Sequence, residues 1–153
     1  MRIRLPLRPY LVFARFTRAL TLGIRGVVLE ADTRVLLVRH TYVEGWHFPG
    51  GAVEPRETAH EALARELDEE GGIALDGPGE LFGLYLNRRY SQRDHVAVFV
   101  CRKWRQAHPP KVPNLEIEDA RFFDVADLPP GTTGPTQRRL AEILRGEQPS
   151  ADW

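Results

Sequence analysis

Three glutamates near the end of one predicted helix are the side chains best suited to chemistry in this chain. Residues 57–70 contain no Gly or Pro, are rich in Ala, Leu and Glu, and are followed by a Gly-Gly pair, which predicts a helix that stops there. Glu66, Glu69 and Glu70 are spaced i, i+3 and i+4, so their carboxylates share one helix face. Because like charges this close repel, a hard divalent cation such as Mg²⁺, which prefers oxygen ligands, would stabilise the cluster.

A solvated acidic surface is the competing interpretation of the same residues. The stretch 54–70 holds seven acidic residues and two arginines, and charged runs of this kind usually face water. Two neighbouring features favour a metal site instead. A Pro-Gly-Gly turn at 49–51 can bring backbone carbonyls close to the carboxylates. Arg65 can pair with Glu61, or it can reach back to Glu57 and hold the turn against the helix.

The spacing of these residues resembles the signature box of the Nudix hydrolase family. Nine specified positions occur within 23 residues, and they are Gly51, Glu57, Arg65, Glu66, Leu67, Glu69, Glu70, Gly72 and Ile73. Weaker similarity extends to the predicted strand at 34–40 and to the Trp-x-x-Pro-Gly-Gly segment at 46–51. It also includes residues 116–123, where Phe122 stands in place of the family's usual tryptophan. The resemblance therefore covers residues 20–146.

The resemblance implies an α/β/α sandwich with a mixed, partly barrel-like sheet, and the chain's own pattern independently indicates an α/β fold. Apolar segments bounded by turn residues predict strands, and a second helix opens with a proline and ends at a glycine. The predicted strands are 22–30, 34–40, 79–87, 94–103 and 120–124, and the second helix is 135–146. We expect one Nudix domain at 20–153, with a helical segment at 1–19 that packs on it or contributes to a homodimer.

The resemblance also implies roles for individual residues, matched position by position. The ligands of Mg²⁺ or Mn²⁺ would be the Gly50 backbone carbonyl, Glu66, Glu69 and Glu70. The pair that braces the loop against the helix would be Glu57 and Arg65. In this family a carboxylate outside the box often completes the metal site or acts as the base. Its best match is Glu116, followed by Glu118 and Asp94.

The reaction that the resemblance implies is hydrolysis of a pyrophosphate bond in a nucleoside diphosphate linked to another group. Divalent cations neutralise the anionic substrate and lower the pKa of the attacking water, and Glu66 or Glu116 would accept the proton. Cationic side chains should hold the phosphates, and the candidates are Arg25, Arg39 and Arg89, with Arg88 and Arg93 beside them. Nucleoside triphosphates, ADP-ribose-like compounds, dinucleotides and capped RNA ends all stay open as substrates.

Two other classes of function fit parts of the pattern. A non-catalytic nucleotide-binding regulatory module of the same fold would be expected to have lost a metal-binding carboxylate, and all three are present. A purely structural acidic helix in an interaction protein would need neither the Gly50-Gly51 turn nor a pairing of Arg65 with Glu57. Both alternatives therefore explain less of the sequence than a hydrolase does.

Composition limits the remaining possibilities. The 153 residues carry 21 basic and 21 acidic side chains, so a general attraction to nucleic acid or to an anionic membrane is not indicated. The single Cys101 excludes an intrachain disulfide, and the lack of a Cys/His cluster argues against zinc. No apolar stretch approaches the ~20 residues that span a bilayer, and no secretory signal pattern is found. We therefore expect a cytoplasmic protein that acts on a small nucleotide.

Overall fold

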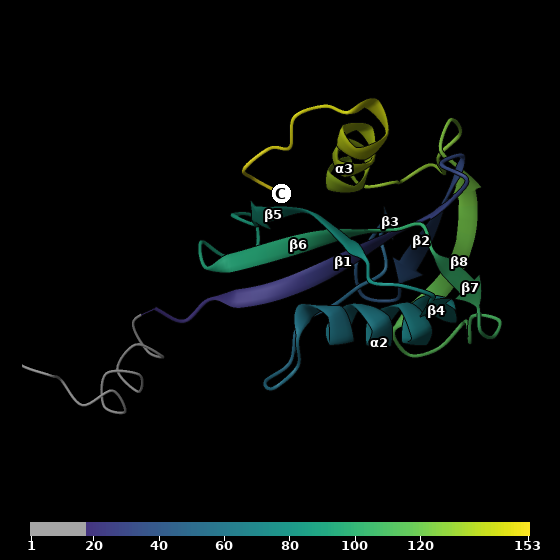
Figure 1. Ribbon diagram of the computed structural model, residues 1–153, viewed down its shortest axis with the longest axis horizontal. Helices are drawn as coiled ribbons and strands as arrows, with labels where there is room; N and C mark the ends of the chain where they lie inside the picture. Colours follow the sequence, from purple (N-terminus) through teal and green to yellow (C-terminus); the bar gives the residue numbers. More distant parts are fainter. Residues whose placement is uncertain (1–17) are drawn as a thin grey trace, which may run out of the picture.

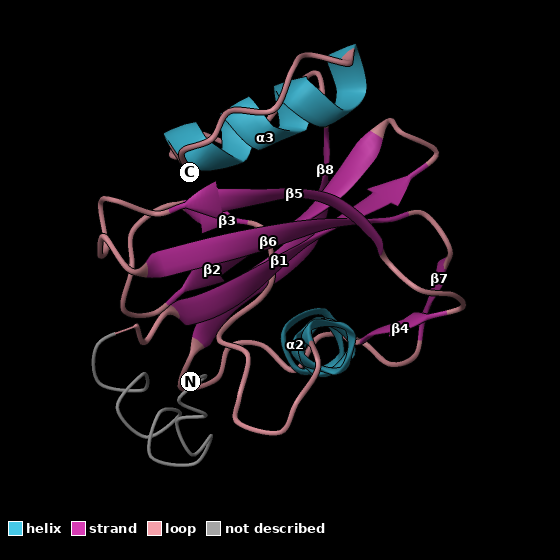
Figure 2. Ribbon diagram, turned by 60° about the vertical axis from the view of Figure 1, so that its left-hand side comes forward, coloured by secondary structure: helices cyan, strands magenta, loops and turns pink. Residues whose placement is uncertain are grey.

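A mixed β-sheet lies between two helices in the computed structural model, which describes residues 18–153. Helix α2 (Ala59–Gly71) covers one face of the sheet and helix α3 (Gly134–Arg145) covers the other (Figures 1 and 2). The strands are β1 (Thr21–Glu30), β2 (Arg34–His40), β3 (Trp46–His47), β4 (Ile73–Leu75), β5 (Glu80–Leu86), β6 (Asp94–Cys101), β7 (Trp104–Gln106) and β8 (Ile117–Asp124). The predicted layer arrangement is confirmed, whereas the predicted helical segment at 1–19 lies almost wholly outside the described residues.

Within the described residues the main sheet is open and branched, and it does not close into a barrel. Its strands follow the order β3-β2-β1-β6-β5, and β8 pairs with β2. Strands β1 and β6 run parallel, with Thr21 opposite Asp94, while the other pairs in this sheet are antiparallel. Strands β4 and β7 form a separate antiparallel pair. The sheet is therefore mixed, as predicted, because one parallel pair lies at its centre.

The pairing of β1 with β2 is short, and this leaves one edge of β1 for the loop that precedes α2. The two strands pair over the last two residues of β1. Nearer its start, β1 bonds to the loop: the Ile24 amide donates to the Gly51 carbonyl at 2.8 Å, and the Gly26 amide donates to the Pro49 carbonyl at 2.9 Å. Strand β1 therefore fixes the position of the Pro-Gly-Gly turn.

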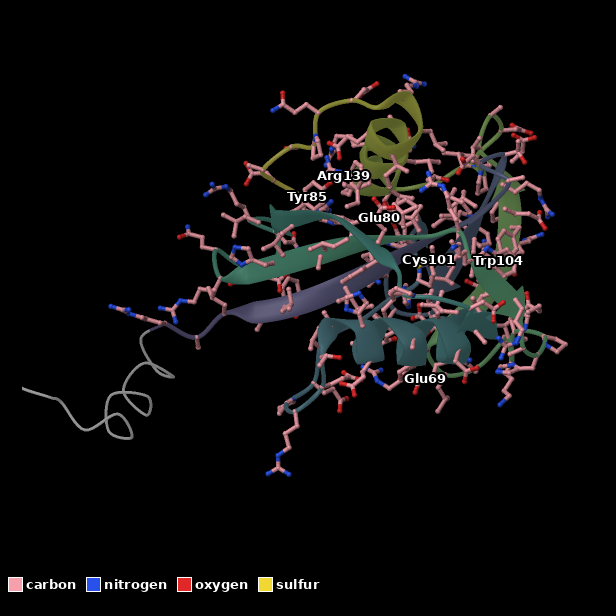
Figure 3. All side chains as sticks on the ribbon, viewed as in Figure 1. Glu69, Glu80, Tyr85, Cys101, Trp104 and Arg139 are labelled. Atoms are coloured by element: carbon pink, nitrogen blue, oxygen red, sulfur yellow. The ribbon has the colours of Figure 1, made fainter. Side chains whose placement is uncertain are left out.

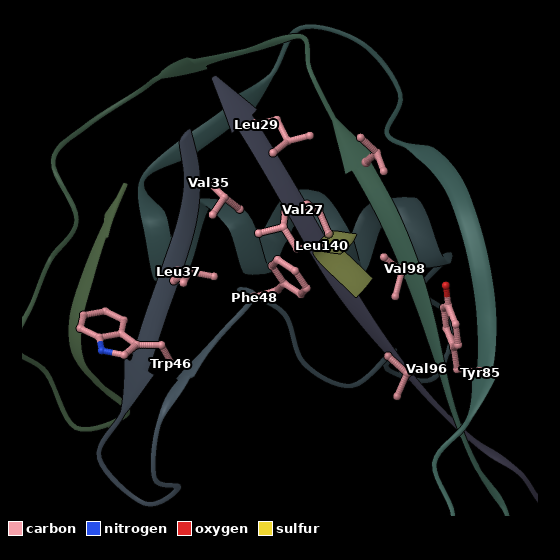
Figure 4. Packing of buried hydrophobic residues seen from close by; sticks show 11 residues of the cluster. Val27, Leu29, Val35, Leu37, Trp46, Phe48, Tyr85, Val96, Val98 and Leu140 are labelled. Carbon is pink, nitrogen blue, oxygen red and sulfur yellow. The ribbon is translucent and has the colours of Figure 1, made fainter. Parts of the chain in front are cut away.

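Two hydrophobic layers hold the helices to the sheet because side chains along β1 alternate between its two faces. Val27 belongs to the buried cluster that includes Leu140 of α3 (Figure 4), whereas Val28 belongs to the cluster that includes Leu67 of α2. Each fully buried side chain of this size contributes about 1.5–3 kcal/mol. A Cβ on Gly26 would lie 2.9 Å from the Leu67 side chain, so α2 packs closely against β1.

Most predicted elements are confirmed, and the differences have local causes. Helix α2 begins at Ala59, two residues later than predicted, because Thr58 forms a capping box with Glu61, and Glu57 therefore lies before the helix. Strand β8 begins at Ile117, three residues earlier than predicted. Strands β3, β4 and β7 were not predicted because two or three residues carry no alternation pattern. Neither helix in residues 18–153 has the length and apolar character needed to cross a membrane.

Candidate functional site

The three glutamates of the predicted metal-binding face differ in how far they are buried. Glu70 is 6% exposed, and the side chains of Glu66 and Glu69 are 13% and 58% exposed. This gradient follows from the packing of α2 against β1, and Glu69 lies on the side of α2 turned away from the sheet (Figure 3). The acidic face therefore runs from solvent inward to the Pro-Gly-Gly turn.

Glycine is required twice where this turn meets the helix. Gly50 has a φ of +142°, which side chains disfavour, and a Cβ there would collide with the Ile24 carbonyl. Gly51 is not in the left-handed region, but a Cβ there would lie 2.8 Å from Cδ of Glu66 and nearer still to its Oε1. The missing side chain of Gly51 leaves the space that the Glu66 carboxylate uses.

Arg65 joins the loop to the helix. Its Nε donates to Glu57 Oε1 at 2.8 Å, its Nη2 donates to Glu57 Oε2 at 3.0 Å, and its Nη1 donates to Glu66 Oε1 at 2.7 Å. Of the two pairings that the sequence allows, the structure has the one with Glu57, while Glu61 is used in the helix cap. The bidentate contact with Arg65 and the Glu54 amide hold the pKa of Glu57 at about 2.

Glu70 is the most deeply buried carboxylate of the three. Its Oε2 accepts a 2.8 Å hydrogen bond from the Gly50 amide, yet burial dominates and raises the pKa of Glu70 to about 8. His40 Nδ1 lies 3.9 Å from Glu70 Oε1, but burial lowers the pKa of His40 to about 4, so its imidazole is neutral near pH 7 and the contact is not an ion pair. A buried carboxyl with one backbone donor is a group that a cation would stabilise in its charged form.

Of the three arginines expected to bind phosphate, Arg25 lies at the acidic face. Its guanidinium donates to the Gly50 carbonyl. Arg89 lines a cavity together with Arg25, and Arg39 is held by two 3.0 Å contacts with Glu118. The fold therefore brings Arg25 to the turn beside the glutamates, places Arg89 on a cavity that Arg25 also lines, and engages Arg39 in an ion pair.

The carboxylates outside the helix also separate into different environments. Glu116 lines a cavity of about 340 Å³ together with Glu69 and Glu70. Asp94 is buried and accepts hydrogen bonds of 2.7 Å and 2.9 Å from a threonine hydroxyl of β1 and an asparagine amide after β5. Glu118 is paired with Arg39. Glu116 is therefore the only one of these three that the fold brings to the acidic face without an arginine or a buried network engaging it.

The donors around the turn can be compared with the needs of a metal ion. Within residues 18–153, no three His, Cys, Asp or Glu side chains are grouped so that they could hold a metal ion; Glu66 bonds to Arg65, Glu70 accepts from the Gly50 amide, and the Gly50 carbonyl accepts from Arg25. The donors are nonetheless all oxygen atoms, including the Gly50 carbonyl, and Mg²⁺ needs few protein ligands because it retains water. The space left at Gly51 lets a carboxylate reach the turn. The set therefore fits hydrated Mg²⁺ or Mn²⁺.

Four residues around this face were missed by sequence reasoning. His40 lies beside the buried glutamate, and Asn87, Tyr90 and Trp153 join the predicted Arg25 in lining two cavities near the turn. These residues come from β2, from the connection between β5 and β6, and from beyond α3. No local pattern could have found them, because only the fold brings these segments together.

Comparison with known proteins identifies the class of domain. The NUDIX domain model matches residues 19–144, and the chain belongs to this family. It is similar to a MutT-like protein of Streptomyces ambofaciens, with 39% identity over 83 residues, which make up 54% of this chain and 51% of the relative. It is also similar to an RNA pyrophosphohydrolase of Halorhodospira halophila, with 44% identity over 64 residues, which make up 42% of this chain and 34% of the relative.

The fold has close structural counterparts as well. A MutT Nudix hydrolase from Burkholderia pseudomallei superimposes with a TM-score of 0.68 and 25% identity, covering 80% of this chain and 97% of that one. The sequence matches are shorter: the chain spans about half the length of the Streptomyces relative and about a third of the Halorhodospira one. The expected Nudix family and α/β fold are therefore confirmed.

Proposed function

We propose that this chain is a Mg²⁺-dependent pyrophosphohydrolase that cleaves a nucleoside diphosphate linked to another group. The observation that carries the proposal is the close approach of the Gly50-Gly51 turn to the partly buried Glu66 and the buried Glu70 on one face of α2. A structural acidic helix would have no need of a turn built so that no side chain separates it from the carboxylates. The name of the RNA pyrophosphohydrolase relative supports the same class of reaction.

In this proposal, different residues bind the metal ion, orient a metal ligand and bind the phosphates. Glu66, Glu69, Glu70 and the Gly50 carbonyl would hold the metal ion, which when bound neutralises phosphate charge and acidifies water. Arg65 keeps the Glu66 carboxylate oriented through its 2.7 Å hydrogen bond. Arg25 would bind phosphate oxygens, with Arg89 further along the cavity.

Glu116 is the proposed general base. It is solvent-exposed and lines the cavity next to Glu69 and Glu70, so its carboxylate can accept a proton from a water molecule held there. Glu66 is the other candidate from sequence, but its Oε1 already accepts a hydrogen bond from Arg65. Because Arg65 engages one oxygen of Glu66 whereas the Glu116 side chain lines the cavity, the role of base is assigned to Glu116.

A substrate screen with a matched pair of variants tests the proposal. The purified chain is incubated with nucleoside triphosphates, ADP-ribose, dinucleoside polyphosphates and capped RNA, with and without Mg²⁺, and the products are separated by chromatography. Glu70→Gln should lower the rate by about 100-fold or more, since even outer-shell partners of a metal cost 10–100-fold. Glu80→Gln changes an exposed glutamate on β5 and should leave the rate unchanged.

Two results would contradict the proposal. If Glu70→Gln hydrolysed the substrate at the same rate as the unaltered chain at saturating Mg²⁺, Glu70 would not be a metal ligand. Nucleotide binding without Mg²⁺-dependent hydrolysis of any substrate would favour the regulatory module instead.

A further inference from the structure

Two adjoining cavities extend from the Pro-Gly-Gly turn toward the start of α3. One has a volume of about 350 Å³ and is bounded by Gly51, and the other has a volume of about 410 Å³ and is bounded by Pro135 of α3. Both are lined by Arg25, Asn87, Tyr90 and Trp153. The combined volume of the two cavities is larger than a diphosphate group would fill, and two of the four residues that line both are aromatic.

The segment Ser150–Trp153 lies along the edge strand β5. The Leu86 amide donates to the Ala151 carbonyl at 2.9 Å, and the Trp153 amide donates to the Leu86 carbonyl at 3.1 Å. Arg88 Nε adds a 2.7 Å contact with the Asp152 carboxylate. The segment is thus attached to the sheet by backbone pairing, and it lies outside residues 19–144 that match the family model.

A buried ion pair under α3 fixes the same segment from the other side. Arg139 is fully buried, and its guanidinium donates to Glu142 Oε1 at 2.6 Å and to the Asp152 carbonyl at 3.0 Å. The Tyr85 hydroxyl donates to Glu142 Oε2 at 3.0 Å, and the Ser150 amide donates to Oε1 at 3.1 Å. Figure 3 shows Arg139 and Tyr85 between α3 and β5. Buried ion pairs add little net stability, but this one sets the position of the chain at 150–153.

This anchoring determines where the Trp153 ring lies. The indole packs edge-on to Tyr85 with ring centroids 5.9 Å apart, and Arg139 Cζ lies 5.7 Å from its ring centroid. The ring is only partly buried, and it lines both cavities. Tyr90, at 81% exposed, lines them from the connection between β5 and β6. Two aromatic side chains with unused surface therefore border one space.

Asn87 adds a polar group with a fixed orientation to this space. Its Nδ2 donates to Asp94 Oδ2 at 2.9 Å, and Asp94 is itself held by Thr21, so Oδ1 is the remaining acceptor of the amide. Aromatic surfaces beside an oriented amide suit a nucleobase, which has π faces for stacking and a polar edge for hydrogen bonding.

We propose that Trp153 and Tyr90 form the stacking surface for the nucleobase of the substrate, and that the segment Ser150–Trp153 thereby sets base preference. A base stacked on Trp153 would direct its phosphates along the cavity wall toward Arg25 and Gly51, which line the same space. The inference rests on the proposed function for the role of the phosphates, but base binding can be measured without hydrolysis.

Steady-state kinetics on the substrate found by the screen provide the first test. Trp153→Ala should raise KM by about 10-fold or more, the loss expected for one stacked base, while kcat changes less than about 3-fold. Trp153→Phe should restore KM to within about 3-fold, because phenylalanine retains a stacking face. Leu84→Ala, at an exposed position of β5, is the matched control and should leave KM unchanged. Thermal melts show whether each variant is folded.

Fluorescence titration with nucleoside 5′-monophosphates separates this inference from the proposed function. The chain has three tryptophans; Trp46 is buried and Trp104 is stacked on Phe122, so quenching by a base should come from Trp153 and be lost in Trp153→Phe. Ribose 5-phosphate, which has no base, should give no quenching. Hydrolysis with unchanged KM in Trp153→Ala and no Trp153-dependent quenching would overturn the inference and leave the proposed function intact. Quenching that depends on Trp153 without hydrolysis of any substrate would support the base-stacking inference and contradict the proposed function.

Discussion

Gly51→Ala is predicted to damage the candidate site while leaving the fold in place. The added Cβ would lie 2.8 Å from Glu66 Cδ, and ordinary contacts begin at 3.4 Å, so the carboxylate must move by more than half an ångström and its nearer oxygen by roughly 1 Å. The obstacle is the end of a flexible side chain, and Gly51 does not have a positive φ, so the backbone is not strained. A displacement of this size at a positioned catalytic group can lower the rate by about 100-fold, which corresponds to roughly 2.7 kcal/mol of activation free energy.

The assay compares this variant with two others by kcat/KM at saturating Mg²⁺ and by thermal melting. Gly77→Ala is the matched control, because its Cβ would meet only Lys103 at 3.8 Å, and it should keep both activity and melting temperature. Gly50→Ala should instead melt at a clearly lower temperature, because its φ of +142° and the Ile24 carbonyl exclude a side chain. Activity in Gly51→Ala within about 3-fold of the unaltered chain would refute the view that the missing Cβ positions Glu66.

Three further predictions concern an ion pair at the site and two buried groups of the fold. Glu57→Gln should lower the urea midpoint of unfolding at pH 7, because it removes the carboxylate that pairs with Arg65. The pKa of Glu57 is about 2 in the folded chain against an ordinary 4.5, so the carboxylate stabilises the fold fully above pH 4.5, and this stabilisation is lost as the pH falls through 2. A difference between the two proteins that did not shrink on acidification would argue against the Arg65–Glu57 pair. Tyr85→Phe removes a buried hydroxyl that donates to Glu142, so urea unfolding should report a loss of about 1.5–3 kcal/mol; a loss below about 0.5 kcal/mol would mean that this bond is unimportant. Burial raises the pKa of the Cys101 thiol to about 12, so a disulfide reagent at pH 8 should label it only after unfolding in urea, and rapid labelling of the folded chain would contradict the burial of β6.

Local patterns were enough to find the helix that carries the site. The segment 57–70 lacks Gly and Pro, so its helical period determines that Glu66 and Glu70 share a face, whatever the rest of the chain does. The hairpin of β1 and β2 was equally local, since two apolar segments are joined by a short turn. Strands β4 and β7 could not be predicted in this way. Each has only three residues, too few to carry a pattern, and each pairs only with the other.

Which side chains meet that helix was decided by the tertiary structure. The sequence left Arg65 with two possible partners, and the capping box engaged Glu61, so the loop glutamate was the one available. It assigned phosphate binding to Arg39 as readily as to Arg25, and only the pairing of β8 with β2 brought Glu118 beside Arg39. Sequence specifies contacts within a few residues because backbone geometry repeats over that distance. The position of Trp153 beside the cavities depends on how separate elements pack, so it cannot be predicted from the spacing of residues along the chain.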